Sequence, residues 1–150
     1  GKSPVIYDSS ESFSIGGSYV VRSSQNDDVA VVAAGITLHE ALVAADRLGE
    51  LGVNARVIDL YSIKPIDADT LMSAARDCGC IVTVEDHWPE GGLGDAVVGL
   101  FADTDLRPRV AKLAVAGMPS SGTAAELMKA AGIDAQHIVE SALRVIPEAK

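Results

Sequence analysis

The sequence is poor in cysteine and in aromatic residues. Aromatic side chains make up only 4% of the 150 residues, and the two cysteines, Cys78 and Cys80, are spaced C-x-C. Zinc sites usually combine four ligands with a C-x-x-C type of spacing, and a disulfide between residues two positions apart would be strained. We therefore expect two reduced thiols, as in a cytoplasmic protein, and neither a metal site nor an aromatic-rich β-sandwich.

Long apolar runs, an excess of basic residues and nucleotide-binding motifs are also missing. No apolar run approaches the roughly 20 residues that cross a bilayer, and the first residues lack the apolar stretch of a signal peptide. Lysine and arginine total 12 against 21 acidic residues, a net charge of −9, so we expect neither nucleic acid nor a membrane as partner. Neither G-x-G-x-x-G nor a Walker A motif is present, which argues against a nucleotide-binding loop.

The residues that are present alternate between short apolar runs and helical patterns. Hydrophobic residues make up 48% of the chain, and the apolar runs predict strands at 18–23, 29–34, 56–60, 80–84 and 109–115. Helical periodicity fills the intervals and the C-terminal end. Such alternation predicts an α/β fold with a parallel sheet and helices on both faces.

Polar residues mark the predicted helix starts and the domain limits. The candidate N-caps are the capping-box pairs Thr37–Glu40 and Thr123–Glu126 and the single residues Asp67 and Asp134. Residues 1–17 are rich in serine and glycine and show little periodicity. We therefore expect a lead-in segment over residues 1–17 and a single domain over residues 18–150.

The loop after the run at 80–84 has the most unusual composition, TVEDHWPEGGLGDA. Ligands of α/β domains bind at the carboxyl ends of strands, where this loop lies. A carboxylate of Glu85 or Asp86 could orient His87 for acid–base chemistry, but no nucleophile or third partner is evident. The free amides of a helix that starts at Gly91–Gly94 could hold an anion, although acidic side chains crowd the same loop.

A tryptophan in a loop often anchors a protein to a partner surface. Trp88 is the only tryptophan, and it stands beside Pro89. We therefore interpret the loop as a structural and interface loop, in which glycines shape the turn and the histidine and tryptophan face a neighbouring domain or subunit. The candidate interface residues are His87, Trp88, Glu90, Gly91 and Gly92.

Five motifs occur in the order typical of one enzyme family. They are GITLHEAL (35–42), RVIDLYSIKPID (56–67), VEDHWPEGGLGDAV (84–97), SGTAAEL (121–127) and AGID (131–134). Together they resemble the C-terminal, third domain of transketolase, most closely of the animal type, from about residue 3 to residue 146. The resemblance implies a three-layer α/β/α domain with a mixed five-stranded sheet of four parallel strands and one antiparallel edge strand, for which 18–23 is the candidate.

The same resemblance implies a cytoplasmic, homodimeric parent enzyme of the pentose phosphate pathway. Transketolases move a two-carbon ketol unit between sugar phosphates, using thiamine diphosphate and a divalent metal, Mg²⁺, held by the first two domains. This chain lacks the G-D-G…N-N signature of that cofactor site, so no catalytic, cofactor-binding or metal-binding residue is expected here. The domain would serve assembly by docking on the thiamine-binding domains, in the same chain or in a separate subunit.

Two alternatives stay open at this point. One is a regulatory module that binds a small anion at Gly91–Gly94. The other is the same domain from deoxyxylulose-phosphate synthase or from the decarboxylase subunit of a 2-oxoacid dehydrogenase. Relatives often carry basic residues in the turn at 118–123, where this sequence has Ser120 and Thr123, so we expect no anion there.

Overall fold

The computed structural model describes residues 3–118 and 120–147. Its strands are β1 (Tyr19–Arg22), β2 (Val29–Ala33), β3 (Ala55–Asp59), β4 (Cys80–Val84) and β5 (Arg109–Leu113). Its helices are α1 (Ile36–Glu50), α2 (Ala68–Cys78), α3 (Leu93–Leu100), α4 (Ala124–Ala131) and α5 (Ala135–Val145). The predicted strands are confirmed, with ends that differ by at most two residues. Pro119 of the turn at 118–123 and residues 148–150 of the predicted domain lie outside the described residues.

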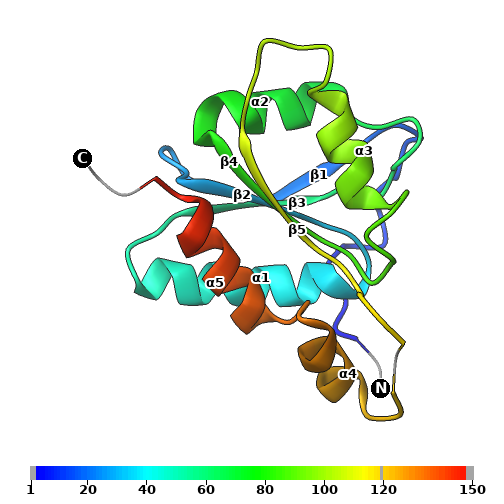
Figure 1. Cartoon of the computed structure of the whole chain (residues 1–150). Helices are drawn as coiled ribbons and strands as arrows, with labels where there is room; N and C mark the ends of the chain where they lie inside the picture. Colours follow the sequence, from blue (N-terminus) through cyan, green and yellow to red (C-terminus); the bar gives the residue numbers. More distant parts are fainter. Residues whose placement is uncertain (1–2, 119, 148–150) are drawn as a thin grey trace.

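The strands form one mixed sheet in the order β1-β3-β2-β4-β5. The edge strand β1 runs antiparallel to β3, and the other neighbouring strands pair in parallel. Figure 1 shows α1 and α5 on one face of the sheet and α2 and α3 on the other. The three-layer α/β/α architecture with an antiparallel edge strand is therefore confirmed.

Two hydrophobic cores lie on opposite faces of the sheet, and the central strands belong to both. In β2, Val29 and Val31 pack with α1 and α5, whereas Ala30 and Val32 pack with α2 and α3. Every residue of β2 and β4 is buried, which explains why these runs are continuously apolar instead of alternating. Across the described residues, none of the helices combines the length and apolarity that crossing a bilayer requires.

Local capping at three helix starts is confirmed. The carboxylates of Asp67 and Asp134 accept hydrogen bonds from backbone amides of α2 and α5. Thr123 and Glu126 form the complete capping box of α4. In each case the cap and the amide lie within one turn, so that local sequence was sufficient to predict them.

The capping box predicted at Thr37 and Glu40 is wrong. Helix α1 begins at Ile36 with Gly35 as its N-cap, two residues before the predicted cap, and has no side-chain cap. The buried hydroxyl of Thr37 lies 2.9 Å from the carbonyl oxygen of Val84, while the carboxylate of Glu40 accepts a hydrogen bond of 2.8 Å from the amide of Ala135. Both side chains thus join distant elements, since Thr37 ties α1 to β4 and Glu40 ties α1 to the start of α5.

The lead-in lacks helix and strand over residues 3–17, yet it packs on the sheet. The Tyr7 hydroxyl donates a hydrogen bond of 2.6 Å to the buried carboxylate of Asp59, the last residue of β3. Neighbouring rings of one aromatic cluster have centroids 4.9–5.4 Å apart; its members are Tyr7, Phe13, Tyr19 and Tyr61. The boundary at residue 18 stays a prediction, but these contacts attach the lead-in to the end of the sheet formed by β1 and β3.

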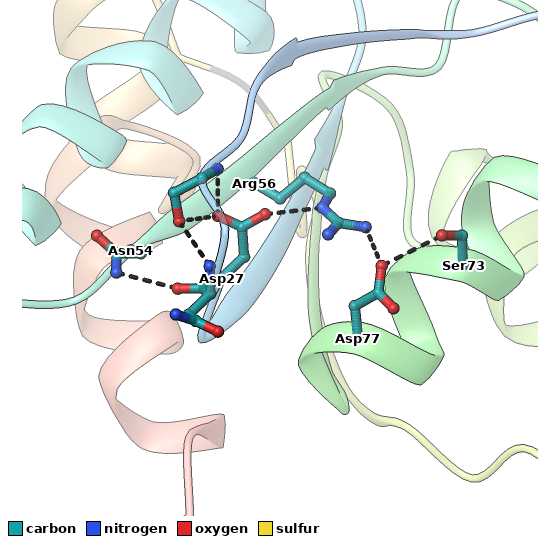
Figure 2. A network of polar contacts seen from close by, with 7 residues as sticks. Asp27, Asn54, Arg56, Ser73 and Asp77 are labelled. Carbon is teal, nitrogen blue, oxygen red and sulfur yellow. Dashed lines mark hydrogen bonds and ion pairs between the residues drawn. The ribbon is translucent and has the colours of Figure 1, made fainter.

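An ion-pair network lies at the opposite end of the sheet, where β2 and β3 begin (Figure 2). Arg56 lies 2.9 Å from the fully buried carboxylate of Asp27 and 2.8 Å from that of Asp77. Burial opposes ionisation of Asp27, but hydrogen bonds from Ser24 and Arg56 outweigh it and hold its pKa below the ordinary value. The network joins the turn before β2 to β3 and to the last turn of α2.

Replacing Asp27 by alanine should therefore destabilise the fold by about 2–4 kcal/mol at pH 7, because it removes a buried charge partner and leaves donors unpaired. Asp46→Ala is the matched control, since Asp46 pairs with Arg22 but its side chain is 66% exposed, and it should cost less than about 1 kcal/mol. Urea unfolding followed by circular dichroism measures both.

The destabilisation by Asp27→Ala should also depend on pH. Because the folded-state pKa of Asp27 is lowered, its contribution is present above the unfolded-state pKa of about 3.9. It should be lost as the pH falls further, through the folded-state pKa. A difference between wild type and Asp27→Ala that is independent of pH, or equal to that of Asp46→Ala, would contradict the role assigned to this carboxylate.

Candidate functional site

The candidate site lies at the edge of the sheet where the parallel strands end. The loop of residues 85–92 leaves β4 at this edge and leads directly into α3 (Figure 1). The loops that follow β2, β3 and β5 lie at the same edge. The lead-in also reaches this edge, because Tyr7 is hydrogen-bonded to Asp59. The position is the one where α/β domains place their ligands.

Glu85 caps α3 from within this loop. Its carboxylate is buried and accepts hydrogen bonds from the amides of Leu93, at 2.6 Å, and Gly94, at 2.9 Å. A carboxylate at this place is stabilised by the free amides and the helix dipole. The amides that a phosphate would use are therefore occupied by the protein's own anion, so the structure does not favour a regulatory anion site at Gly91–Gly94.

Two glycines are required by the geometry of this cap. A Cβ atom on Gly92 would lie 1.9 Å from Oε2 of Glu85 and 2.8 Å from Nδ1 of His87, so a side chain would displace the capping carboxylate. Gly91 has a φ of 73°, a backbone conformation that other residues adopt only with strain. Gly92 is buried and therefore shapes the loop without itself presenting a surface to a partner.

Lys112 of β5 holds the middle of the loop. Its Nζ donates a hydrogen bond of 2.8 Å to the carbonyl oxygen of Pro89 and pairs with the carboxylate of Asp95. Asp95 in turn accepts a hydrogen bond of 2.7 Å from the amide of Gly91. The bonds from Lys112 and Gly91 keep the pKa of Asp95 below its ordinary value, so the loop is fixed to β5 and α3.

The loop presents its remaining side chains to the outside. The His87 side chain is 57% exposed and Trp88 is 49% exposed, and Glu90 and Gly91 are exposed as well. Nδ1 of His87 lies 2.9 Å from the carbonyl oxygen of Trp88 but 4.0 Å from Glu85, too far for a hydrogen bond. The structure thus does not form the acid–base pair that the sequence allowed.

The other residues with catalytic potential lie apart from this loop. His39 is on α1, and His137 on α5 is bonded to the N-cap carboxylate of its own helix. Both cysteines are free thiols, and burial raises the pKa of Cys78 to about 11, which makes it a weak nucleophile at neutral pH. Within residues 3–118 and 120–147, no group of three His, Cys, Asp or Glu residues is arranged to hold a metal ion.

Sequence reasoning missed a set of exposed apolar residues at the same edge. Besides Trp88, they are Val5, Ile15, Ile63 and Met118, each more than 40% exposed. All belong to the lead-in or to loops that follow β3 and β5. The available signal was a large apolar residue isolated among serine, glycine and proline, but the sequence did not reveal that these segments share one edge.

Comparison with known proteins gives one consistent family. A family model described as "Transketolase, C-terminal domain" matches residues 18–138. The chain is 48% identical to transketolase-like protein 1 of Bos taurus over 145 residues, which cover 95% of this chain and 24% of that protein. It is 42% identical to Homo sapiens transketolase, covering 97% and 23%. The chain thus spans about a quarter of the length of these relatives.

Solved structures give the same result. A chain described as "Split gene transketolase, inactive beta4 tetramer" superposes with a TM-score of 0.88 at 33% identity, covering 95% of this chain and 46% of that one. Transketolase from Leishmania mexicana superposes with a TM-score of 0.67 at 21% identity, covering 89% and 19%. The second likeness concerns the fold alone.

The contact between Gly92 and Glu85 predicts opposite effects for two glycine substitutions. Gly92→Ala should destabilise the domain by about 2–4 kcal/mol, because the new Cβ displaces Glu85 and uncaps α3. Gly99→Ala is the control. No atom lies within 4 Å of the Cβ position of Gly99, so alanine should stabilise the helix by about 0.5–1 kcal/mol. Chemical unfolding distinguishes the two, and a Gly92→Ala cost below about 0.5 kcal/mol would rule out the proposed clash.

Proposed function

The chain belongs to the transketolase C-terminal domain family, and from that membership we propose that it serves an enzyme that transfers two-carbon ketol units between sugar phosphates. About three-quarters of the length of its relatives lies outside this chain. In this proposal, the outside part binds thiamine diphosphate and Mg²⁺ in a homodimeric, cytoplasmic enzyme of the pentose phosphate pathway. The matches to transketolases do not favour the other thiamine enzymes considered above.

The residues of the candidate site do not fit thiamine diphosphate. A diphosphate needs free amides or cationic side chains, whereas the amides at the start of α3 are bonded to Glu85. Lys112, which contacts this loop, is paired with Asp95, and Asp86 and Glu90 add further negative charge. We therefore assign this chain no chemical step and propose that it is inactive alone.

The proposed role is docking on the thiamine-binding domains, either in the same chain or in a separate subunit. The observation that supports it most directly is the fixed loop that exposes His87 and Trp88 next to Glu90 and Gly91. Large apolar side chains exposed together mark protein contact surfaces, and tryptophan is frequent among interface hot spots. The lead-in contacts the same edge through Tyr7 and Asp59.

The structural neighbour that is a split-gene transketolase is described as an inactive tetramer. By analogy, we propose that the present chain gains a function only with the thiamine-binding domains. The test is ketol transfer from xylulose 5-phosphate to ribose 5-phosphate with thiamine diphosphate and Mg²⁺. The isolated chain should give no turnover, and adding the thiamine-binding domains should restore it. Enzyme-like turnover by the chain alone would refute the proposal.

Trp88→Ala should weaken association with the thiamine-binding domains by roughly 2 kcal/mol or more, as expected of a hot-spot tryptophan. The matched control is Leu143→Ala on α5, because Leu143 is similarly exposed at 46% but does not belong to the loops at the carboxyl ends of the strands. Analytical ultracentrifugation gives both dissociation constants. Turnover of the assembled Trp88→Ala enzyme should stay near that of the wild type, and a large loss of turnover in an intact assembly would assign the residue to the chemistry instead.

A further inference from the structure

A second feature of the same edge is a cavity of about 270 Å³ beneath α4. Apolar side chains from four parts of the fold line most of it. They are Ile36 at the start of α1, Val115 after β5, Leu127, Met128 and Ala131 of α4, and Ile133 before α5. The volume is just below the roughly 300–1,000 Å³ of pockets for drug-sized ligands, so it suits an inserted side chain.

Helix α4 leaves its apolar side incompletely covered. The helix is complete in itself, with a capping box at Thr123 and a left-handed glycine, Gly132, at its end. None of its residues is buried, however, and Figure 1 shows it at the periphery of the molecule. Leu127 and Met128 face the cavity while remaining partly exposed. Apolar surface of this kind gains stability when a further apolar group covers it.

One charged side chain lines the cavity. Asp86 lines it and is exposed, and its side chain has no hydrogen bond or ion pair within the part of the chain that the structure describes. The residue adjoins His87 and Trp88, so the cavity continues the surface of the proposed docking loop. An unpaired carboxylate on a protein of net charge −9 favours a cationic partner over a second copy of this chain.

We propose that the cavity receives an apolar side chain from the thiamine-binding domains, and that a lysine or arginine of the same segment pairs with Asp86. This inference rests on the proposed docking function and adds a second anchor to Trp88. Apolar anchors in pockets typically dominate binding energy, and charges at the rim steer and orient the partner.

The experiment measures binding of this chain to the separately produced thiamine-binding domains of the same enzyme. Ala131→Phe fills the cavity from inside and should weaken binding at least tenfold. Ala125→Phe is the matched control, because Ala125 is exposed on the same helix and does not line the cavity. It should bind within twofold of the wild type. Circular dichroism of each variant verifies the fold.

A second pair of variants tests the charge independently of packing. Asp86→Lys should weaken binding about tenfold at low salt, and the difference should shrink as salt screens the repulsion. Asp69→Lys on α2, an exposed residue in the first turn of that helix, carries the same charge change and should have little effect. Since Asp86 has no partner within the described residues, its replacement leaves the fold intact.

The outcomes separate this inference from the proposed function. Absence of binding between the wild-type chain and the thiamine-binding domains would overturn both. Wild-type binding with Ala131→Phe and Asp86→Lys within twofold would overturn only the cavity. Self-association of the wild-type chain that Ala131→Phe abolishes, with unchanged binding to the thiamine-binding domains, would assign the cavity to a second copy and overturn the inference as well.

Discussion

The hydrogen bonds from the first amides of α3 to Glu85 determine what the end of the sheet where the parallel strands terminate can bind. They convert a helix start that could attract an anion into one that is already neutralised. They also require Gly92 to lack a side chain. Because these amides are not free to bind an anion, the loop offers other molecules mainly its outer surface, which carries His87 and Trp88.

The strands and most helix starts were predictable because their signals are local or repeated, whereas the antiparallel pairing of β1 was expected only from the family resemblance. Every residue of β2 and β4 is apolar or, in the case of Thr83, able to lie buried in a strand, and Asp67 and Asp134 cap amides within one turn. Thr37 and Glu40 show where such reasoning fails. Their spacing is that of a capping box, yet Thr37 bonds to Val84 and Glu40 to Ala135, which are 47 and 95 positions away in the chain, and no local pattern contains that information.

That the loop after β4 is an interface stays a prediction, and the sequence did not reveal the hydrogen bonds that hold this loop. Its composition and its place after a buried strand identified the loop, and His87 and Trp88 are exposed as an interface requires. Glu85 caps α3 only because the folded loop brings its carboxylate to the start of the helix. The same contact buries Gly92. The exposed Val5 and Met118 join the surface through folding alone, since they are 113 positions apart in the chain.

The Arg56 network and the Trp88 loop lie at opposite ends of the same strands, with the two cores between them. Substitutions that far apart usually act additively. Exposed side chains of the Trp88 loop can therefore be exchanged without disturbing the ion pairs around Arg56. Such separation of the two ends agrees with a family whose members include long single chains and a split-gene protein.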